Sequence, residues 1–266
     1  MNRYSRLKKI LKSMRSVLVA YSGGVDSTFL LKVALDTLGG KNVLAVTANS
    51  PTYAKHELRF SRKMAREIGA RQRVIETEEL RNSKFAKNPL NRCFYCKNEL
   101  FSKLKKIAKQ EGINFVIDAS NAADLLDYRP GAKAKNKLGI RSPLQEAGIT
   151  KQEIRDLSKK LGLKTWNMPQ LACLASRFPY GDKITEEKLR RVEKAESLIR
   201  RMGFSDVRVR SYDGLCRIEV ARNKIAGLIN GMDKKTISKL KKLGYNYIMV
   251  DMEGFRSGSM NMGVKK

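Results

Sequence analysis

The run Ser22-Gly23-Gly24-Val25-Asp26-Ser27 has the residue types that hold a phosphate group. Two glycines let the backbone bend tightly and approach an anion closely. Free amides at a following helix N-terminus attract negative charge, and the two serines add hydroxyl donors. Because Asp26 repels phosphate directly, it predicts a Mg²⁺ ion between the carboxylate and the phosphates. The run lacks the lysine of a Walker A loop, and an ordinary glycine turn capped by Ser27 is the alternative interpretation.

Three cysteines form a second chemical set. Cys93 and Cys96 are spaced as CxxC, which places two thiolates on one turn where they can share a metal or a cluster, and Cys173 follows in the run 169–181. Three thiolates leave a tetrahedral zinc site without a fourth ligand, whereas a [4Fe-4S] cluster keeps one iron open for an added sulfide. A redox dithiol, or two turn cysteines with one buried free cysteine, are the alternatives. Cys216 lies in a strand-like run and is expected in the core.

Strands and helices must alternate to position these residues. Apolar runs predict strands at 17–20, 43–50, 73–77 and 114–120, and helical periodicity predicts helices at 28–39, 56–70 and 150–161. The segment 91–112 is predicted to be a cysteine turn that leads into a further helix. Continuous apolar strands are typical of a parallel sheet covered on both faces. We therefore predict an α/β fold with a doubly wound parallel sheet. Thr150 and Glu153 form a capping box at the start of the last of these helices.

The sequence pattern changes near Thr185. A charged helix over 184–203 is followed by short strands and a further helix, at 207–211, 216–221, 234–244 and 247–252. This pattern predicts a small α+β domain. We predict a nucleotide domain over 1–168, a hinge over 169–184 that carries Cys173, and a small substrate or oligomerisation domain over 185–266. Functional residues often lie on such connections.

The charge and the histidine content limit the function classes. The 266 residues include 55 Lys and Arg against 26 Asp and Glu, a formal net charge of +29. This excess suits RNA or anionic nucleotides. The basic residues are nevertheless spread from Lys8 to Lys266, so a solvated lysine-rich surface is an equal alternative. The only histidine, His56, lies in a helical run, which argues against a Ser-His-Asp or Cys-His arrangement.

The sequence also predicts where the protein works. No apolar run approaches the ~20 residues of a membrane span. The basic N-terminus lacks a signal-peptide core and cleavage site. We expect a cytoplasmic protein, without structural disulfides, that does not enter a membrane.

The phosphate run resembles the pyrophosphate-binding motif of the PP-loop ATP pyrophosphatases. That superfamily cleaves ATP to AMP and pyrophosphate, and the AMP activates a carbonyl or carboxylate oxygen. In the superfamily, backbone groups at the end of the second strand contact adenine. The resemblance implies that the segment Ala45 to Ser50 has this role here.

Blocks in order along nearly the whole chain resemble one PP-loop family, the LarE sulfur transferases of nickel-pincer nucleotide synthesis. These blocks are VAYSGGVDSTFLLKVA, NPLNRCFYCKNELF, DASNAADLLDYRPG, RSPLQEAGITKQEIRDLSKKLGL, LACLASRFPYGDKIT, VRVRS and CRIEV. The resemblance implies ATP-dependent conversion of the carboxylates of pyridinium-3,5-biscarboxylic acid mononucleotide to thiocarboxylates. Some members give up the sulfur of the cysteine at the position of Cys173. Members that also carry the CxxC are thought to pass on a sulfide bound to a [4Fe-4S] cluster, and this chain matches that type.

The resemblance implies further ATP-site residues in the block 118–131. Asp124, Asp127, Arg129 and Gly131 lie in this block, which in the family follows a sheet strand at the ATP site. A helix-capping loop is the alternative interpretation of the same residues.

Substrate contacts are expected near Cys173 and on the C-terminal strands. Ser176 and Arg177 could bind a phosphate or orient the substrate. Arg208 and Arg210 point to one strand face, where two guanidinium groups suit a nucleotide phosphate. The alternative for them is a solvated edge strand. Glu219 is either their ion-pair partner or a substrate contact.

Other functions compete with this one. A tRNA thiolation enzyme also combines a PP-loop with cysteines and suits the basic charge, but no zinc-ribbon pairs or RNA-binding appendage are recognisable. An ammonia-using synthetase leaves the three cysteines unexplained. A nucleotide-binding module would bind ATP without releasing pyrophosphate. The expected partners are a small nucleotide, sulfide or another sulfur donor, and copies of the same chain in a symmetric oligomer such as a hexamer.

Overall fold

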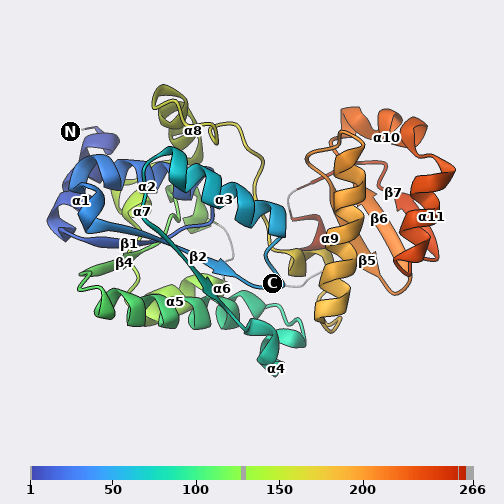
Figure 1. Ribbon diagram of the computed structural model, residues 1–266, viewed down its shortest axis with the longest axis horizontal. Coiled ribbons are helices and arrows are strands. Elements are labelled where there is room, and N and C mark those ends of the chain that lie inside the picture. The colour runs from blue at the N-terminus through green and yellow to red at the C-terminus, as the bar shows by residue number, and fades with distance from the viewer. Residues whose placement is uncertain (1, 127–129, 257, 262–266) are drawn as a thin grey trace. The chain divides into compact units, whose positions relative to one another are not determined.

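The computed structural model describes residues 2–126, 130–256 and 258–261 (Figure 1). The chain divides into two compact units. Unit 1 contains Met1–Phe85 and Leu90–Leu171, and unit 2 contains Ala86–Pro89 and Ala172–Lys266. The predicted hinge over 169–184 stays a prediction.

Unit 1 is built on a four-stranded parallel sheet. The strands are β1 (Val17–Ala20), β2 (Val43–Asn49), β3 (Gln72–Glu76) and β4 (Phe115–Ile117), in the order β3-β2-β1-β4. In the register, Val17 of β1 lies opposite Val43 of β2 on one side and Phe115 of β4 on the other. This arrangement confirms the predicted α/β fold with a parallel sheet. The order reverses at β1, and ligands of such sheets bind at the carboxyl ends of the strands near this point.

Helices cover both faces of the sheet (Figure 1). Val17 and Val19 of β1 belong to a buried cluster with α1 and α2, whereas Leu18 belongs to a second cluster with Phe101 and Leu104 of α5. A strand buried on both faces needs a continuous apolar run, which explains the lack of alternation in its sequence. The helices of this unit are α1 (Arg3–Met14), α2 (Val25–Leu38), α3 (Lys55–Glu67), α4 (Ser83–Ala86), α5 (Arg92–Gln110), α6 (Pro130–Lys137), α7 (Pro143–Ala147) and α8 (Lys151–Lys160).

The predicted capping box is confirmed at the start of α8. The Thr150 hydroxyl accepts from the backbone N–H of Glu153, and the Glu153 carboxylate accepts from the backbone N–H of Thr150 at 2.8 Å. This reciprocal cap fixes where α8 begins. It therefore also fixes the position of Lys151, the first residue of the helix.

Unit 2 is a small α+β unit with a three-stranded sheet. Its strands are β5 (Arg208–Tyr212), β6 (Leu215–Glu219) and β7 (Tyr247–Val250), with β5 antiparallel and β7 parallel to β6. Helix α9 (Glu186–Arg201) packs on β5 through an apolar stripe that includes Leu189, Val192 and Ile199. The two remaining helices are α10 (Ile225–Gly231) and α11 (Lys234–Lys242).

Among the residues that the structure describes, no helix has both the length and the apolar character required to cross a membrane.

Candidate functional site

The predicted phosphate loop connects β1 to α2. The loop begins after Ala20, and α2 begins at Val25 with Gly24 at its N-cap. Gly24 provides no side-chain cap. The first amides of α2 are therefore available to an anion. The loop is braced from within, because the Ser27 hydroxyl lies 3.1 Å from the Ser22 hydroxyl and donates to the Gly24 carbonyl.

Gly23 makes the closest backbone approach in this loop. Its φ is +75°, a conformation that favours glycine, and a Cβ placed on it would lie 2.6 Å from the Cβ of Ser61. Ser61 is fully buried on α3. The position therefore requires glycine both for its dihedral angle and for its contact with α3.

Asp26 lies in the first turn of α2 with its two carboxylate oxygens in different environments. The Oδ2 atom accepts from the Lys151 ammonium at 2.6 Å. The Oδ1 atom is buried, and no described residue gives it a hydrogen-bond partner. A buried carboxylate oxygen without a donor is a suitable ligand for a hard cation. This single oxygen fits a Mg²⁺ ion that takes its other ligands from phosphate and water.

The end of β2 lies at the same edge of the sheet. Ala45 is buried in the middle of β2, and its N–H donates to the Arg71 carbonyl. Ser50 follows the strand, and its hydroxyl donates to the Glu79 carboxylate at 2.7 Å. The carboxyl end of a parallel strand is the usual place for a ligand, so Ser50 is better placed than Ala45. The adenine contact stays a prediction for both residues.

A polar loop follows β4 at this edge. The Asp124 carboxylate accepts from the backbone N–H of Asn121 at 2.9 Å, which matches the capping-loop alternative. Gly131 lies in α6, and a Cβ on it would lie 3.1 Å from the Lys97 side chain, so the start of α6 packs against α5. Arg129 and Asp127, both expected at the ATP site, lie outside the described residues. The predicted ATP contacts of this loop stay predictions.

Cys93 and Cys96 both lie inside α5, rather than in a turn before a helix as predicted. The reason is geometric: a spacing of three places both side chains on one face of the first helical turns, so no separate turn is needed. Cys93 is exposed and Cys96 is half-buried, and neither is in a disulfide. Each thiol is accessible enough to serve as a metal or cluster ligand.

Cys173 begins a short 3₁₀ helix in unit 2, Leu174–Arg177. The Cys173 carbonyl accepts from the Ser176 amide at 3.0 Å, from the Ser176 hydroxyl at 2.8 Å and from Arg177 Nη1 at 3.3 Å. The thiol is exposed. These three bonds fix the backbone while the side chain remains accessible, as a reacting or ligating thiol requires.

Among the described residues, no group of three or more His, Cys, Asp or Glu side chains is assembled to hold a metal ion.

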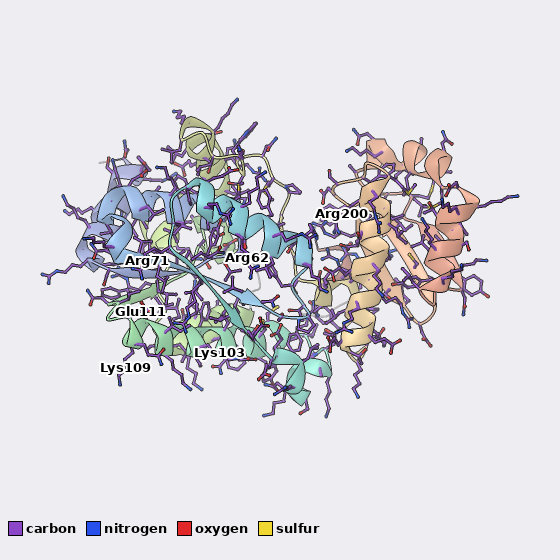
Figure 2. All side chains as sticks on the ribbon, in the orientation of Figure 1. Arg62, Arg71, Lys103, Lys109, Glu111 and Arg200 are labelled. Atoms are coloured by element: carbon purple, nitrogen blue, oxygen red, sulfur yellow. The ribbon has the colours of Figure 1, made fainter. Side chains whose placement is uncertain are left out.

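Arg177 is joined to α9 by a buried ion pair. Its Nε and Nη2 atoms donate to the two oxygens of Glu196, at 2.7 and 3.2 Å. Both side chains are almost completely buried. Glu196 also accepts from Arg200, a residue of α9 labelled in Figure 2, and from the Val209 amide of β5. Arg177 therefore ties the Cys173 turn to α9 and β5.

The environment of Glu196 sets its pKa. Burial raises the pKa, but the Arg177 and Arg200 guanidinium groups and the Val209 amide act in the opposite direction and prevail. The pKa of Glu196 therefore lies below its ordinary value. The ionised carboxylate is the form that the fold stabilises.

Glu219 holds a second group of arginines. Arg210 donates to its carboxylate through Nε and Nη2, at 2.9 and 2.7 Å, and Arg217 donates to its other oxygen at 3.0 Å. The remaining guanidinium nitrogen of Arg210 donates to the Ser176 carbonyl. Arg208 pairs with Asp206 and lies over the Phe255 ring. Arg208 and Arg210 are thus buried and paired, not solvated, and Glu219 is the ion-pair partner of Arg210.

Cys216 lies in the core, as predicted. Cys216 is fully buried in β6, and burial raises the pKa of its thiol to about 12. His56 lies on α3 and is half-buried.

Sequence reasoning missed several residues of the site. Glu196 had a readable signal, because it occupies the apolar stripe of α9 between Val192 and Ile199, where an acid needs a buried partner. Lys151 and Glu79 had no local signal. Lys151 is 125 residues from Asp26, and only the fold brings them together.

The sequence is similar to known proteins along its whole length. A family model described as NAD synthase matches residues 4–100. An uncharacterised protein of Synechocystis sp. is 42% identical over 266 residues, covering 100% of this chain and 99% of that protein. The pyridinium-3,5-bisthiocarboxylic acid mononucleotide synthase of Lactiplantibacillus plantarum is 39% identical over 251 residues, covering 94% of this chain and 91% of that enzyme. An uncharacterised protein of Methanocaldococcus jannaschii is 29% identical over 253 residues.

The contact between Gly23 and Ser61 predicts that Gly23→Ala destabilises the fold more than the same change at an uncrowded glycine. Gly69→Ala is the matched control, because Gly69 has φ +72° but nothing within 4 Å of the added Cβ. We expect the control to lower the free energy of unfolding by about 1–2 kcal/mol, the strain of an alanine in the left-handed region. Gly23→Ala should lower the free energy of unfolding by clearly more than the control does, and it should also weaken ATP binding. Urea unfolding and calorimetric titration with ATP measure both effects, and equal costs at the two positions would contradict the clash.

The lowered pKa of Glu196 predicts a pH-dependent stability. Its contribution is complete above the ordinary glutamate pKa of about 4.3 and is lost as the pH falls through the lower folded value. We expect Glu196→Gln to lower the free energy of unfolding by about 3–5 kcal/mol at pH 7, because the buried Arg177 and the partly buried Arg200 lose their charge partner. This cost should shrink as the pH falls below about 4. Urea unfolding from pH 3 to pH 7 tests the prediction.

Glu187→Gln is the control for Glu196→Gln. Glu187 also pairs with an arginine of α9, but its side chain is 82% exposed. We expect a cost below about 1 kcal/mol, as for other exposed ion pairs. A similar cost for the two variants would mean that the buried pair does not organise unit 2.

Proposed function

Because the chain belongs to the LarE family of PP-loop ATP pyrophosphatases, we propose that it is an ATP-dependent sulfur transferase acting on a pyridinium mononucleotide. Its substrate would be pyridinium-3,5-biscarboxylic acid mononucleotide, and its product the bisthiocarboxylic acid of nickel-pincer nucleotide synthesis. The printed name of the Lactiplantibacillus plantarum relative supports this substrate. It also favours a small nucleotide over tRNA.

The observation that carries the proposal is the phosphate loop with the unpartnered oxygen of Asp26. The amides around Gly24 are suited to the β- and γ-phosphates of ATP. Asp26 Oδ1 would be the protein ligand of Mg²⁺, which when bound neutralises the pyrophosphate leaving group. Lys151 holds the other carboxylate oxygen and so orients Asp26.

The reaction divides into two displacements at each carboxylate. A substrate carboxylate oxygen attacks the α-phosphorus of ATP, which forms an acyl adenylate and releases pyrophosphate. A sulfide then attacks the activated carbonyl carbon, which forms the thiocarboxylate and releases AMP. The phosphate loop serves the first step by holding the leaving pyrophosphate. The second step needs a sulfur donor.

We propose a [4Fe-4S] cluster held by Cys93, Cys96 and Cys173 as that donor. Cys93 and Cys96 share one helix face, and the exposed Cys173 has its backbone fixed by three hydrogen bonds. Three thiolates leave the fourth iron without a cysteine ligand. When bound, the cluster supplies a sulfide to the activated carboxylate.

A cluster of arginines in unit 2 supports an anion site for the substrate phosphate. Glu196 pairs with Arg177 and Arg200, and Glu219 pairs with Arg210 and Arg217, of which Arg217 also pairs with Asp251. Ser176 contacts both groups. Its hydroxyl accepts from Arg177, and its backbone carbonyl accepts from Arg210. The substrate phosphate is proposed to bind near Ser176, beside these guanidinium groups.

Association into a symmetric oligomer stays part of the proposal, and its test is the molecular mass in solution. A strictly monomeric mass by light scattering would count against it.

The first test of the function is the identity of the nucleotide products. We expect AMP and pyrophosphate from ATP and Mg²⁺ in the presence of the pyridinium dicarboxylate. Asp26→Asn should reduce pyrophosphate release by about 10²-fold or more, because a neutral amide is a weaker ligand for the Mg²⁺ that would neutralise the leaving pyrophosphate. Asp36→Asn, which breaks an exposed pair with Lys32 on the same helix, is the control and should leave the rate unchanged. Formation of ADP and phosphate would overturn the proposal.

The second test separates the source of the sulfur from ATP cleavage. After anaerobic reconstitution with iron and sulfide, replacement of Cys93, Cys96 or Cys173 by alanine should abolish cluster absorbance and sulfur transfer together, while adenylation survives. Cys216→Ala is the control and should change neither, because this thiol is buried in β6. Mass spectrometry of substrate and protein measures the transfer.

Two results would point instead to a consumed cysteine. One is a Cys93→Ala protein that still transfers sulfur once per chain. The other is dehydroalanine at Cys173 in the intact mass after turnover. Either would leave the CxxC with a structural role only.

A further inference from the structure

The segment between β2 and α3 contacts the phosphate loop directly. The Tyr53 hydroxyl donates to the backbone carbonyl of Ser22 at 2.5 Å. Tyr53 is 31 residues from Ser22, and it lies between Ser50, at the end of β2, and the start of α3. Neither the phosphate motif nor the function proposed above assigns a role to this tyrosine.

The bond acts on one peptide group of the loop. The Ser22 carbonyl and the Gly23 N–H belong to the same planar trans peptide, so fixing the oxygen fixes the hydrogen on the opposite side. Among the described residues, no protein acceptor is recorded for the Gly23 N–H. Without the tyrosine bond, this peptide could rotate, because glycine tolerates many backbone conformations.

Other contacts hold the tyrosine segment in place. Thr52 and Ser50 both donate to one oxygen of the buried Glu79 carboxylate, at 2.5 and 2.7 Å. On the other side of Tyr53, Ser61 of α3 lies against Gly23. The tyrosine therefore extends from a segment that is anchored on both sides.

The tyrosine keeps its proton at any ordinary working pH. Burial, with the nearby Glu57 and Tyr21, raises the pKa of Tyr53 above its usual value. The phenol thus remains a donor to the Ser22 carbonyl under the conditions of an assay.

We propose that Tyr53 is a positioning residue that holds the Ser22–Gly23 peptide so that the Gly23 N–H faces the pyrophosphate part of ATP. This inference rests on the proposed function, because it assumes that ATP occupies the loop. Pyrophosphate occupies the loop both as part of ATP and as product. Loss of the bond should therefore weaken the binding of both, and it should spare AMP, which lacks the pyrophosphate.

Tyr53→Phe tests the inference, since it removes the hydroxyl and keeps the ring. We expect KM for MgATP and the inhibition constant of inorganic pyrophosphate to rise together by about tenfold, the loss of one hydrogen bond. The inhibition constant of AMP and kcat should stay within about twofold of the wild-type values. A merely structural role would instead lower the active fraction, and so kcat, with KM unchanged. Tyr4→Phe is the control, because Tyr4 lies on α1 with its ring near Phe29.

Calorimetric titration with inorganic pyrophosphate separates this inference from the proposed function. If the wild type releases orthophosphate instead of pyrophosphate, the proposed function fails, but the titration still tests Tyr53. Equal pyrophosphate affinity in wild type and Tyr53→Phe would overturn the positioning role, as would an equal loss of AMP affinity. A wild-type protein that binds neither ATP nor pyrophosphate would overturn both.

Discussion

The contact between the backbone of Gly23 and Ser61 is the constraint on which the proposed phosphate site of unit 1 depends. A side chain at Gly23 would lie 2.6 Å from the Ser61 Cβ, so the loop and α3 are packed as closely as two peptide chains permit. The same loop is bounded by β1 before it and α2 after it. Its amides and Asp26 are thereby fixed in one arrangement before any ligand arrives, which is the condition for strong electrostatic stabilisation.

Unit 2 differs from unit 1 in that it holds paired arginines inside a small domain. Arg177 and Arg210 are nearly buried, and each is paired with a carboxylate that is itself fully buried. Such pairs are costly to desolvate and are weak evidence for stability. These ion pairs are better explained by a role in orientation. Both guanidinium groups also donate to the turn that carries Cys173 and Ser176, and so they hold that turn in place.

The sequence was most informative where the signal was local. The apolar run at Val17–Ala20, the glycines before α2 and the Thr150 cap predict the parallel sheet, the loop between β1 and α2 and the start of α8. These features arise from residues within a few positions of each other. The CxxC was assigned to a turn, because a spacing of three fits a turn and a helix equally well.

The missed residues act over long distances in the sequence. Lys151 reaches Asp26 across 125 residues, and Tyr53 reaches Ser22 across 31. No periodicity or short motif encodes such a pair, since it depends on which strands are neighbours. Glu196 is the exception. An acidic residue within the apolar stripe of α9 indicates a buried partner, although the sequence does not identify that partner.

The short segment Ala86–Pro89 has a consequence for the order of folding. It belongs to unit 2 although it lies in the chain between the two segments of unit 1, and Asn88 donates to the Pro179 carbonyl across 91 residues. Closing a flexible loop of that length costs about 4 kcal/mol of chain entropy. Folding of unit 1 orders the intervening chain and so removes much of that cost. We therefore expect unit 2 to form after unit 1. A fragment that begins at Ala172 would lack one of the segments of unit 2.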